Sequence, residues 1–325
     1  MSELHKFIFE DLPVRGMLVR LTDGWQETLA RRRVAGAYPP EVQDLLGQML
    51  AAGVLMQGNI KFNGALVLQI SGDGPLKLAV AEVQSDLSFR ATASLGSAGP
   101  GAVPTGASLS QMVNVDNQGR CAITLDPKDR LPGQQPYQGV VPLFGDRQEK
   151  LEKLSQVLEH YMLQSEQLDT CMVLAANGEV AAGLLIQRLP VMGQGNLAGL
   201  MDRDANEDQI GRSEDYQRIA MLAATLQPQE LLGLGADEIL HRLFWQETLT
   251  RYEPLRPRFA CSCSRQRVGG MLRGLGAVEV DQILVEQGRI EVGCEFCGVL
   301  YHFDAVDAAQ IFTEGSHRPA PGGVH

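Results

Sequence analysis

The chain has 325 residues, of which 44% are hydrophobic and 21% charged, and its formal net charge is −11. A chain of this length can bury a hydrophobic core without covalent cross-links, and two or three structural units are expected. The acidic excess opposes binding to a phosphate backbone, so no nucleic-acid partner is expected. No apolar run approaches the roughly 18 residues of a membrane span, and the N-terminal stretch lacks the pattern of a signal peptide. We therefore expect a cytoplasmic protein with no membrane partner.

Residues 1–190 are predicted to form a domain of mixed α and β structure. Apolar residues recur at helical spacing over 42–50, which predicts a helix there. Apolar residues then alternate over 66–70 and again over 76–80, with the turn sequence SGDGP between them. This pattern predicts a β-hairpin in which Gly72 and Gly74 offer positive φ angles to the turn.

Two further hairpins and a helix are predicted in the same domain. The sequence QMVNVDNQGRCAITL is expected to turn near 117–119, and CMVLAANGEVAAGLLIQ to turn at Asn177-Gly178, a strong hairpin signal. Between them, apolar residues within 151–162 share one helical face. Because short turns rather than βαβ crossovers join the strands, the predicted class is α+β with a largely antiparallel sheet.

Residues 191–257 are predicted to be a helical linker region of marginal, metastable structure. The first part is rich in glycine, aspartate and asparagine, and two short helices follow it. Ser213 is placed to cap the first helix, and Asp237 lies near the start of the second. Helices this short are unstable alone in water, so their apolar faces are expected to pack on a neighbouring surface.

The region 258–313 contains two close pairs of cysteines, one in a C-x-C sequence and one in a C-x-x-C sequence. These four cysteines are Cys261, Cys263, Cys294 and Cys297. Around the second pair the sequence predicts a strand, a turn, a second strand and a short helix that Asp304 caps. The tail, 314–325, is predicted to be disordered.

The cysteine pattern predicts a site that holds one Zn²⁺ per chain. In a reducing compartment, paired cysteines in a long chain more often bind metal or carry redox chemistry than form structural disulfides. Tetrahedral zinc places thiolate sulfurs about 2.3 Å from the ion and under ~4 Å from one another, so each pair must lie on a tight turn. Gly298 is expected to provide the backbone turn after the second pair. Neighbouring arginines are expected to offset the excess negative charge of four thiolates: Arg256, Arg258, Arg265 and Arg267.

The same cysteines are compatible with more than one function. A site of four cysteines is structural by default, but oxidants attack thiolates, so oxidation would release the metal and unfold a small unit that depends on it. Two alternatives stay open: a thiol–disulfide oxidoreductase that uses Cys294 and Cys297 as a catalytic pair, and a constitutive zinc-ribbon module that docks a partner.

Cys121 and Cys171 lie in predicted strands and are expected to be core thiols. The sequence contains no G-x-x-x-x-G-K-[ST] motif, so no ATP-driven cycle is predicted, and it contains no G-x-S-x-G or H-E-x-x-H motif either.

The combination of C-x-C and C-x-x-C near the C-terminus resembles the 33 kDa chaperonin family, a group of redox-regulated bacterial heat-shock holdases. The resemblance covers almost the whole chain, through segments in the family's order: LQISGDGPL (68–76), YQGVVPL (137–143), SEQ (165–167), GLLIQRLP (183–190), CSCS (261–264) and CEFCG (294–298). Two stretches, 85–108 and 126–136, depart from the family pattern. They affect the expectation for local loops and not for the cysteine site.

The resemblance implies a reduced, zinc-bound and inactive protein whose metal ligands are Cys261, Cys263, Cys294 and Cys297. Peroxide together with unfolding stress, or hypochlorous acid, would form the disulfides Cys261–Cys263 and Cys294–Cys297. Loss of zinc would unfold the linker region, and the protein, not an enzyme, would bind unfolded or partly unfolded client proteins without ATP, as a homodimer when oxidised. A C-x-C disulfide closes a very small ring, because extended residues i and i+2 lie near the ~6.8 Å limit for bridged Cα atoms. Such a strained bond is easily reduced, which suits a reversible switch.

Overall fold

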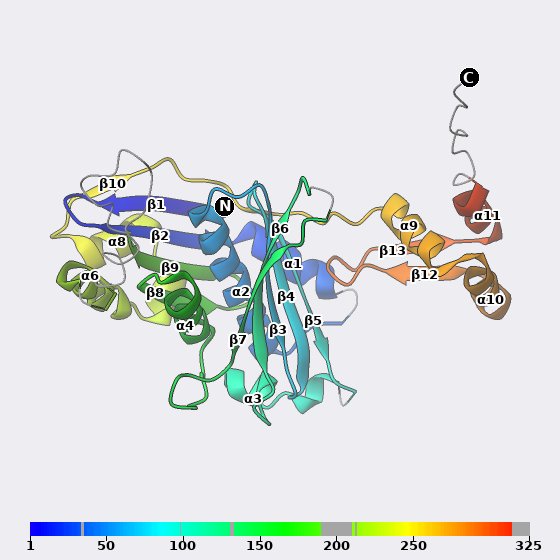
Figure 1. Ribbon diagram of the computed structural model, residues 1–325, viewed down its shortest axis with the longest axis horizontal. Helices are drawn as coiled ribbons and strands as arrows, with labels where there is room; N and C mark the ends of the chain where they lie inside the picture. Colours follow the sequence, from blue (N-terminus) through cyan, green and yellow to red (C-terminus); the bar gives the residue numbers. More distant parts are fainter. Residues whose placement is uncertain (34–35, 98, 131–132, 190–209, 212, 314–325) are drawn as a thin grey trace, which may run out of the picture. The chain divides into compact units, whose positions relative to one another are not determined.

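The computed structural model describes residues 1–33, 36–97, 99–130, 133–189, 210–211 and 213–313 (Figure 1). The chain forms two compact units, Met1–Ala260 and Cys261–His325. The predicted disordered tail and the part of the predicted linker at 191–209 lie outside the described residues. Within the described part, no helix combines the length and the apolar character needed to cross a membrane.

The first sheet of the larger unit is antiparallel throughout, with strand order β10-β1-β2-β9-β8. Its strands are β1 (Glu3–Phe9), β2 (Val14–Leu21), β8 (Thr170–Ala176), β9 (Ala181–Arg188) and β10 (Leu249–Arg251). The hairpin predicted at Asn177-Gly178 is confirmed as β8–β9, and the Oδ1 atom of Asn177 accepts the N–H groups of Glu179 and Val180 at 2.8 Å each. The β1–β2 hairpin was not among the sequence predictions.

The second sheet has the order β11-β5-β4-β3-β6-β7 and is antiparallel except for the β11–β5 pair. Its strands are β3 (Gly64–Ser71), β4 (Leu76–Gln84), β5 (Ser88–Leu95), β6 (Arg120–Pro127), β7 (Tyr137–Pro142) and β11 (Arg258–Phe259). The predicted class, α+β with largely antiparallel sheets, is therefore confirmed.

The predicted β3–β4 hairpin is present, but its glycines serve a different purpose from the one expected. Gly72 and Gly74 are absent from the described glycines with positive φ. A Cβ on Gly72 would lie 2.3 Å from the carbonyl oxygen of Val113, and one on Gly74 would lie 2.2 Å from that of Met112. Glycine is required because the backbone of a neighbouring helix approaches the turn closely.

The hairpin predicted around 117–119 is wrong. Its first arm forms a short helix, α3 (Leu109–Val113), because Ser108 and Gln111 make a reciprocal capping box at its start. The second arm is β6, which pairs with β3 and β7 instead.

Helix α2 (Pro40–Asn59) fills the space between the two sheets. The larger unit also contains α1 (Asp23–Arg33), α4 (Leu154–Glu166) and the 3₁₀ turn η1 (Pro100–Ala102). The predicted helix over 42–50 is the first half of α2, whose residues are buried against strands of both sheets. The helix predicted within 151–162 is α4, although Leu151 precedes its first turn. The packing of α2 against the two sheets forms the main hydrophobic core of the larger unit.

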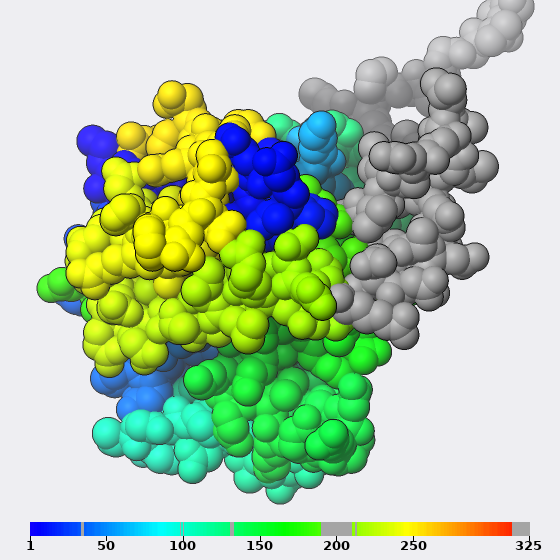
Figure 2. Space-filling model, turned by 90° about the vertical axis from the view of Figure 1, so that its left-hand side faces the viewer, coloured from blue at the N-terminus to red at the C-terminus, as the bar shows by residue number. Residues whose placement is uncertain are grey.

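Three short helices cover the opposite face of the first sheet: α6 (Glu214–Ala224), α7 (Pro228–Gly233) and α8 (Ala236–Phe244). The Oγ atom of Ser213 accepts the N–H of Tyr216 at 3.3 Å, which confirms the predicted cap of α6. Asp237 lies in the first turn of α8, as predicted, and Gly235 is the N-cap. A second apolar cluster joins the helices to the sheet: Phe7, Phe9, Val14, Leu18, Leu184 and Ile186 with Ile219, Leu231, Ile239, Leu240 and Phe244. Figure 2 shows these helices and the following segment, in yellow-green and yellow, beside the dark blue N-terminal strands.

The smaller unit has its own small core. Its elements are α9 (Arg265–Leu275), α10 (Ala277–Gln287), β12 (Ile290–Gly293), β13 (Leu300–Phe303) and α11 (Ala305–Thr313). The predicted order of strand, turn, strand and helix is confirmed, and Asp304 caps α11 by accepting the N–H groups of Val306 and Asp307 at 2.9 and 2.8 Å. Among its described residues, five hydrophobic side chains are fully buried in the core: Leu272, Val280, Ile290, Phe303 and Ala308. So few buried side chains provide little folding energy.

Candidate metal centre

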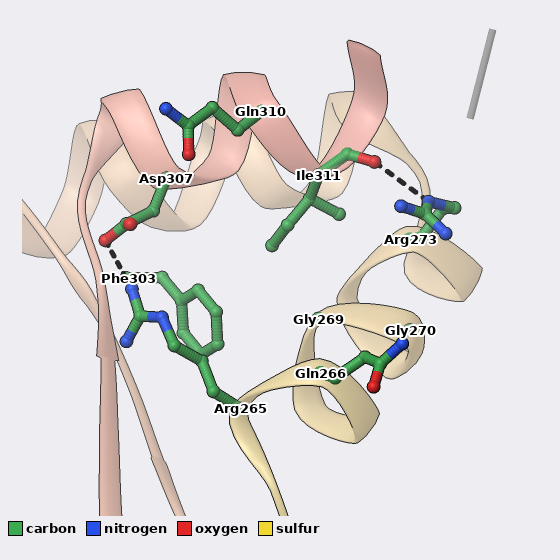
Figure 3. A pocket seen from close by; sticks show the side chains of 9 residues that line it. All are labelled: Arg265, Gln266, Gly269, Gly270, Arg273, Phe303, Asp307, Gln310 and Ile311. Atoms are coloured by element: carbon green, nitrogen blue, oxygen red, sulfur yellow. Dashed lines mark hydrogen bonds and ion pairs between the residues drawn. The ribbon is translucent and has the colours of Figure 1, made fainter. Parts of the chain in front are cut away.

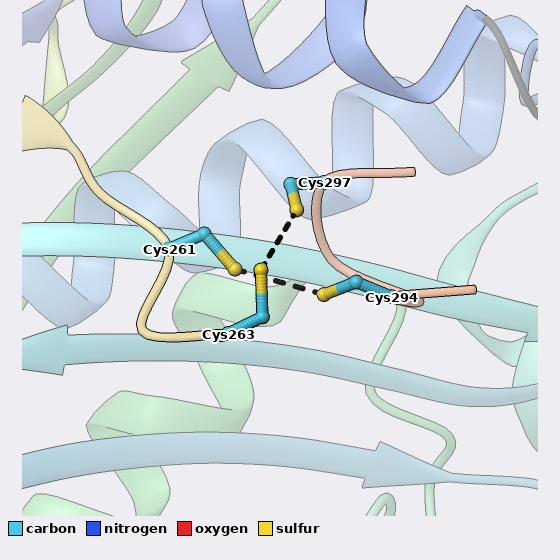
Figure 4. A group of neighbouring side chains, drawn as sticks. All are labelled: Cys261, Cys263, Cys294 and Cys297. Carbon is cyan, nitrogen blue, oxygen red and sulfur yellow. Dashed lines mark hydrogen bonds between the residues drawn. The ribbon is translucent and has the colours of Figure 1, made fainter. Parts of the chain in front are cut away.

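The four predicted site cysteines come together in the smaller unit (Figure 4). Cys261 and Cys263 lie on the segment that leads into α9, whereas Cys294 and Cys297 lie on the turn between β12 and β13. The Sγ atoms of Cys261 and Cys294 are 3.6 Å apart, and those of Cys263 and Cys297 are 3.3 Å apart. All four sulfurs lie within 4.8 Å of one another.

The turn that carries the second pair has the predicted knuckle geometry. Gly298 adopts a φ of +68°, a left-handed conformation that favours glycine. Its N–H donates to the carbonyl oxygen of Cys294 at 2.8 Å, and the N–H of Cys294 donates to the carbonyl oxygen of Val299 at 2.9 Å. Burial raises the pKa of the Cys294 thiol, and hydrogen bonds from the backbone N–H groups of Cys297 and Phe296 oppose this rise. Such donors stabilise a thiolate, which is the form that binds metal.

The first pair is held by contacts of the residues beside it. The Nη1 atom of Arg267 donates to both the carbonyl oxygen and the Oγ of Ser262, at 3.0 and 2.7 Å. Ser264 caps α9, because its Oγ accepts the N–H of Arg267 at 3.2 Å. These contacts fix the bend that brings both sulfurs of a C-x-C sequence to the same side.

Tyr301 is a site residue that the sequence reasoning missed. Its hydroxyl donates to the Sγ of Cys263 at 3.2 Å, and this hydrogen bond raises the pKa of Tyr301 to about 12. A donor to a ligand sulfur orients the ligand and tunes the metal site. The signal available in the sequence was its place on the strand that leaves the C-x-x-C turn.

The predicted role of the four arginines holds only in part. Arg267 contacts the segment of the first pair, as described above. Arg265 instead forms an ion pair with Asp307 at 2.7 Å and stacks over Phe303. Arg256 and Arg258 form ion pairs with carboxylates of the larger unit, on Glu3 and Asp86. Local carboxylates, rather than the thiolates, therefore balance most of this positive charge.

A pocket beside the site lies between α9 and α11 (Figure 3). The ion pair of Arg265 with Asp307 closes one end of it. At the other end, the Nε atom of Arg273 donates to the carbonyl oxygen of Ile311 at 2.8 Å. These two contacts fasten α11 to the helix that follows the first cysteine pair.

The donor set fits a zinc ion. Four sulfurs placed tetrahedrally at about 2.3 Å from a metal are ~3.8 Å from one another, and the observed separations lie around that value. Four soft thiolate donors suit Zn²⁺ in a closed, structural type of site. The two sulfur contacts given above each join a cysteine of the first pair to one of the second. All six cysteines are thiols in this structure.

The remaining two cysteines lie in the larger unit. Cys121 is buried in β6, and burial raises its pKa to about 12. Cys171, on β8, packs against the second apolar cluster, and its pKa is also raised by burial to about 12. Both lie among apolar side chains of the larger unit, as predicted for core thiols.

The fold and the site define a class of α+β protein that carries a separate four-cysteine cluster at its C-terminal end. The model of the family described as "Hsp33 protein" matches residues 2–304. The 33 kDa chaperonin of Chromobacterium violaceum is 45% identical over 311 residues, covering 96% of this chain and 94% of the relative. That of Methylobacillus flagellatus is 43% identical, with 96% and 94% covered. The chain therefore belongs to the Hsp33 family.

A solved structure agrees with this assignment at the level of the fold. The 33 kDa chaperonin of Thermotoga maritima, a heat shock protein 33 homologue, superposes with a TM-score of 0.70 at 19% identity. The match covers 97% of this chain and 98% of the other chain.

Proposed function

We propose that this protein is a redox-regulated, ATP-independent holdase of the cytoplasm. In the reduced state Cys261, Cys263, Cys294 and Cys297 hold one Zn²⁺, and the protein is inactive. After oxidation it associates as a homodimer and binds unfolded or partly unfolded client proteins. The observation that carries the proposal is the convergence of four cysteine sulfurs within 4.8 Å in a unit with so small a core. Bound zinc supplies folding energy of order 10 kcal/mol in small domains of this kind.

Oxidation would act directly on the ligands. Formation of Cys261–Cys263 and Cys294–Cys297 removes four electrons from the four thiolates. Two molecules of hydrogen peroxide accept these electrons with four protons and are reduced to four molecules of water. Disulfide sulfurs no longer serve as thiolate ligands, so the smaller unit loses its metal and with it most of its stability.

The client-binding state would follow from release of the linker region, 191–257. Its described helices, α6 to α8, have 11, 6 and 9 residues and are too short to persist without the sheet beneath them. Their apolar faces and the sheet face of Phe7, Leu18 and Ile186 cover each other. Separation would expose both, and exposed apolar surface is what an unfolding protein also presents.

A light-scattering assay of an aggregating client tests the proposal. The protein is either reduced and zinc-loaded, or treated with peroxide at raised temperature, and zinc is measured in both samples. We expect one Zn²⁺ per chain and no suppression in the reduced sample, and zinc loss with suppression in the oxidised one. Equal suppression in both states would instead indicate a constitutive zinc-ribbon module. Turnover of disulfide substrates without stoichiometric zinc would indicate an oxidoreductase.

A further inference from the structure

An extended segment of the linker region lies along the edge of the first sheet. We call residues 248–256, with the sequence TLTRYEPLR, the strap. Its central part is β10, which pairs with β1, and Figures 1 and 2 show it beside the N-terminal strand. The strap closes an edge of β1 that would otherwise present unpaired backbone groups.

Backbone hydrogen bonds hold the strap in place. The N–H of Tyr252 donates to the carbonyl oxygen of Lys6 at 3.0 Å, and the N–H of Glu10 donates to that of Thr248 at 3.0 Å. Leu4 and Leu255 exchange both of their backbone hydrogen bonds, at 2.9 and 3.0 Å. In an antiparallel pair, every second residue directs its backbone N–H and C=O toward the partner strand. The backbone groups of Thr250 therefore point toward Ile8.

Side chains of the strap contribute little burial. None of its nine residues is fully buried, and six of the side chains on its central and C-terminal part are exposed: Thr250, Arg251, Tyr252, Glu253, Leu255 and Arg256. Leu249 and Pro254 are half-buried, and Leu249 packs against the second apolar cluster. Besides the side-chain contacts of Thr250 with Glu10 and of Arg256 with Glu3, the edge of β1 holds the strap through main-chain groups, which every polypeptide has.

The opposite edge of the same sheet is closed in a different way. At β8, the N–H of Met172 donates to the Oε1 of Glu159 at 2.6 Å, and the N–H of Ala176 donates to the Oδ1 of Asp44 at 3.1 Å. Both carboxylates come from core helices, α4 and α2, and are permanent parts of the larger unit. Among the described residues, the linker region pairs as a strand with β1, whereas it meets β8 through the helices α6 and α7.

We propose that the edge of β1 is a binding site for an extended segment of an unfolded polypeptide, and that the strap occupies this site until the linker is released. The inference rests on the proposed holdase function and names a surface for it. The incoming segment would add as an antiparallel strand to Leu4, Lys6, Ile8 and Glu10, a mode of recognition known as β-augmentation.

The same geometry gives the site a chemical preference. Leu249 and Arg251 of the strap pair with Phe9 and Phe7, whose side chains lie on the sheet face beneath α8. Cross-strand partners point to the same face of a sheet. A client segment with apolar residues at alternate positions would therefore form backbone hydrogen bonds and also cover the apolar face that the helices leave. Such segments are typical of strands that become exposed when a protein unfolds.

Residue-resolved hydrogen exchange of the full-length protein tests the site. The probe is reduced, carboxymethylated α-lactalbumin, an unfolded chain without free thiols. In the reduced protein the amides of Ile8 and Glu10 should be protected. Oxidation should remove the protection, and the probe should restore it by at least about tenfold, as two or more hydrogen bonds would. The amide of Phe7, which faces β2, is the internal control and should stay protected throughout.

Peptide competition supplies a second measurement with a matched control. The strap peptide is made with backbone N-methyl groups on Thr250 and Tyr252, which face β1, or on Leu249 and Arg251, which face away. The unmodified peptide and the second form should displace the probe, and the first form should be at least about tenfold weaker. Equal competition by both methylated forms would overturn the proposal.

The outcomes separate this proposal from the holdase function. If the oxidised protein holds the probe while Ile8 and Glu10 remain unprotected, the edge site is wrong and the holdase function stands. If these amides become protected without probe, in proportion to protein concentration, the occupant is a second copy of the chain and the proposal also fails. If the oxidised protein does not hold the probe at all, both proposals fall.

Discussion

The contact of Phe244 with the first sheet provides the most direct test of how the linker is held. The ring is 2% exposed, and it meets Phe9 edge-on at a centroid distance of 5.0 Å and Phe7 at 6.2 Å. Truncation of a buried phenylalanine to alanine costs about 3–5 kcal/mol. Because α8 has nine residues and little stability of its own, most of that cost falls on its docking. At about 3 kcal/mol, Phe244→Ala raises the population of undocked helix about 150-fold.

The assay uses reduced, zinc-loaded protein, so that the cysteines are not involved. Tryptic cleavage at Arg242 reports opening of α8, and suppression of client aggregation reports holding. Trp245→Ala is the matched control, because this adjacent aromatic side chain is 67% exposed. We expect Phe244→Ala to be cleaved much faster and to hold clients without oxidation. If it is cleaved no faster than the control, the packing argument is refuted. If it opens without holding clients, the helices do not mask the binding surface.

Three further predictions concern the metal centre and one half-buried carboxyl group. Cys294→Ser should lower zinc content well below one per chain in a chelator-release assay, whereas Cys121→Ala should retain it; equal retention would contradict the ligand assignment. Tyr301→Phe removes the donor to Cys263 and should weaken zinc binding about tenfold in competition with a chelator, the low end for such contacts; unchanged affinity would show that the hydrogen bond is incidental. Burial raises the pKa of Glu159 from 4.5 to about 7, so the folded state binds the extra proton, and stability falls as pH rises from about 4.5 to 7. In urea unfolding curves, Glu159→Gln should therefore gain up to about 3 kcal/mol over the natural chain above pH 7 and nothing below pH 4; parallel pH profiles would show that the group is not perturbed.

Local patterns in the sequence predicted the parts of the fold that depend on local interactions. The hairpin at Asn177-Gly178 and the caps at Ser213 and Asp304 each involve residues a few positions apart, and all are present. The prediction of a hairpin near 117–119 was wrong because the segment before the turn forms the helix α3 instead of a strand. The capping box of Ser108 with Gln111 stabilises the helix α3 in this segment.

Contacts between distant segments were not predictable from one sequence. The close approach of α3 that requires Gly72 and Gly74 joins parts of the chain that no periodicity relates. The strap on β1 pairs residues some 240 positions apart, and its sequence, interrupted by Pro254, does not resemble a strand. In the smaller unit, the convergence of the four cysteine sulfurs was predictable because cysteines that bind one metal ion follow a recognisable spacing. The role of Tyr301 was not predictable, since its place on the strand after the C-x-x-C turn does not by itself reveal a hydrogen bond to Cys263.

The central strand β9 has a consequence for synthesis of the chain. All eight of its residues are buried, with Ala181 and Leu185 in the main core and Leu184 and Ile186 under the three short helices. The strands β1, β2, β8 and β9 are complete at Arg188, but the cover over their second face ends only at Phe244, 56 residues later. At 5–20 residues per second, a ribosome takes about 3–11 seconds to make that stretch. During this interval the nascent chain exposes the apolar second face of this sheet, because the helices that cover it have not yet been synthesised.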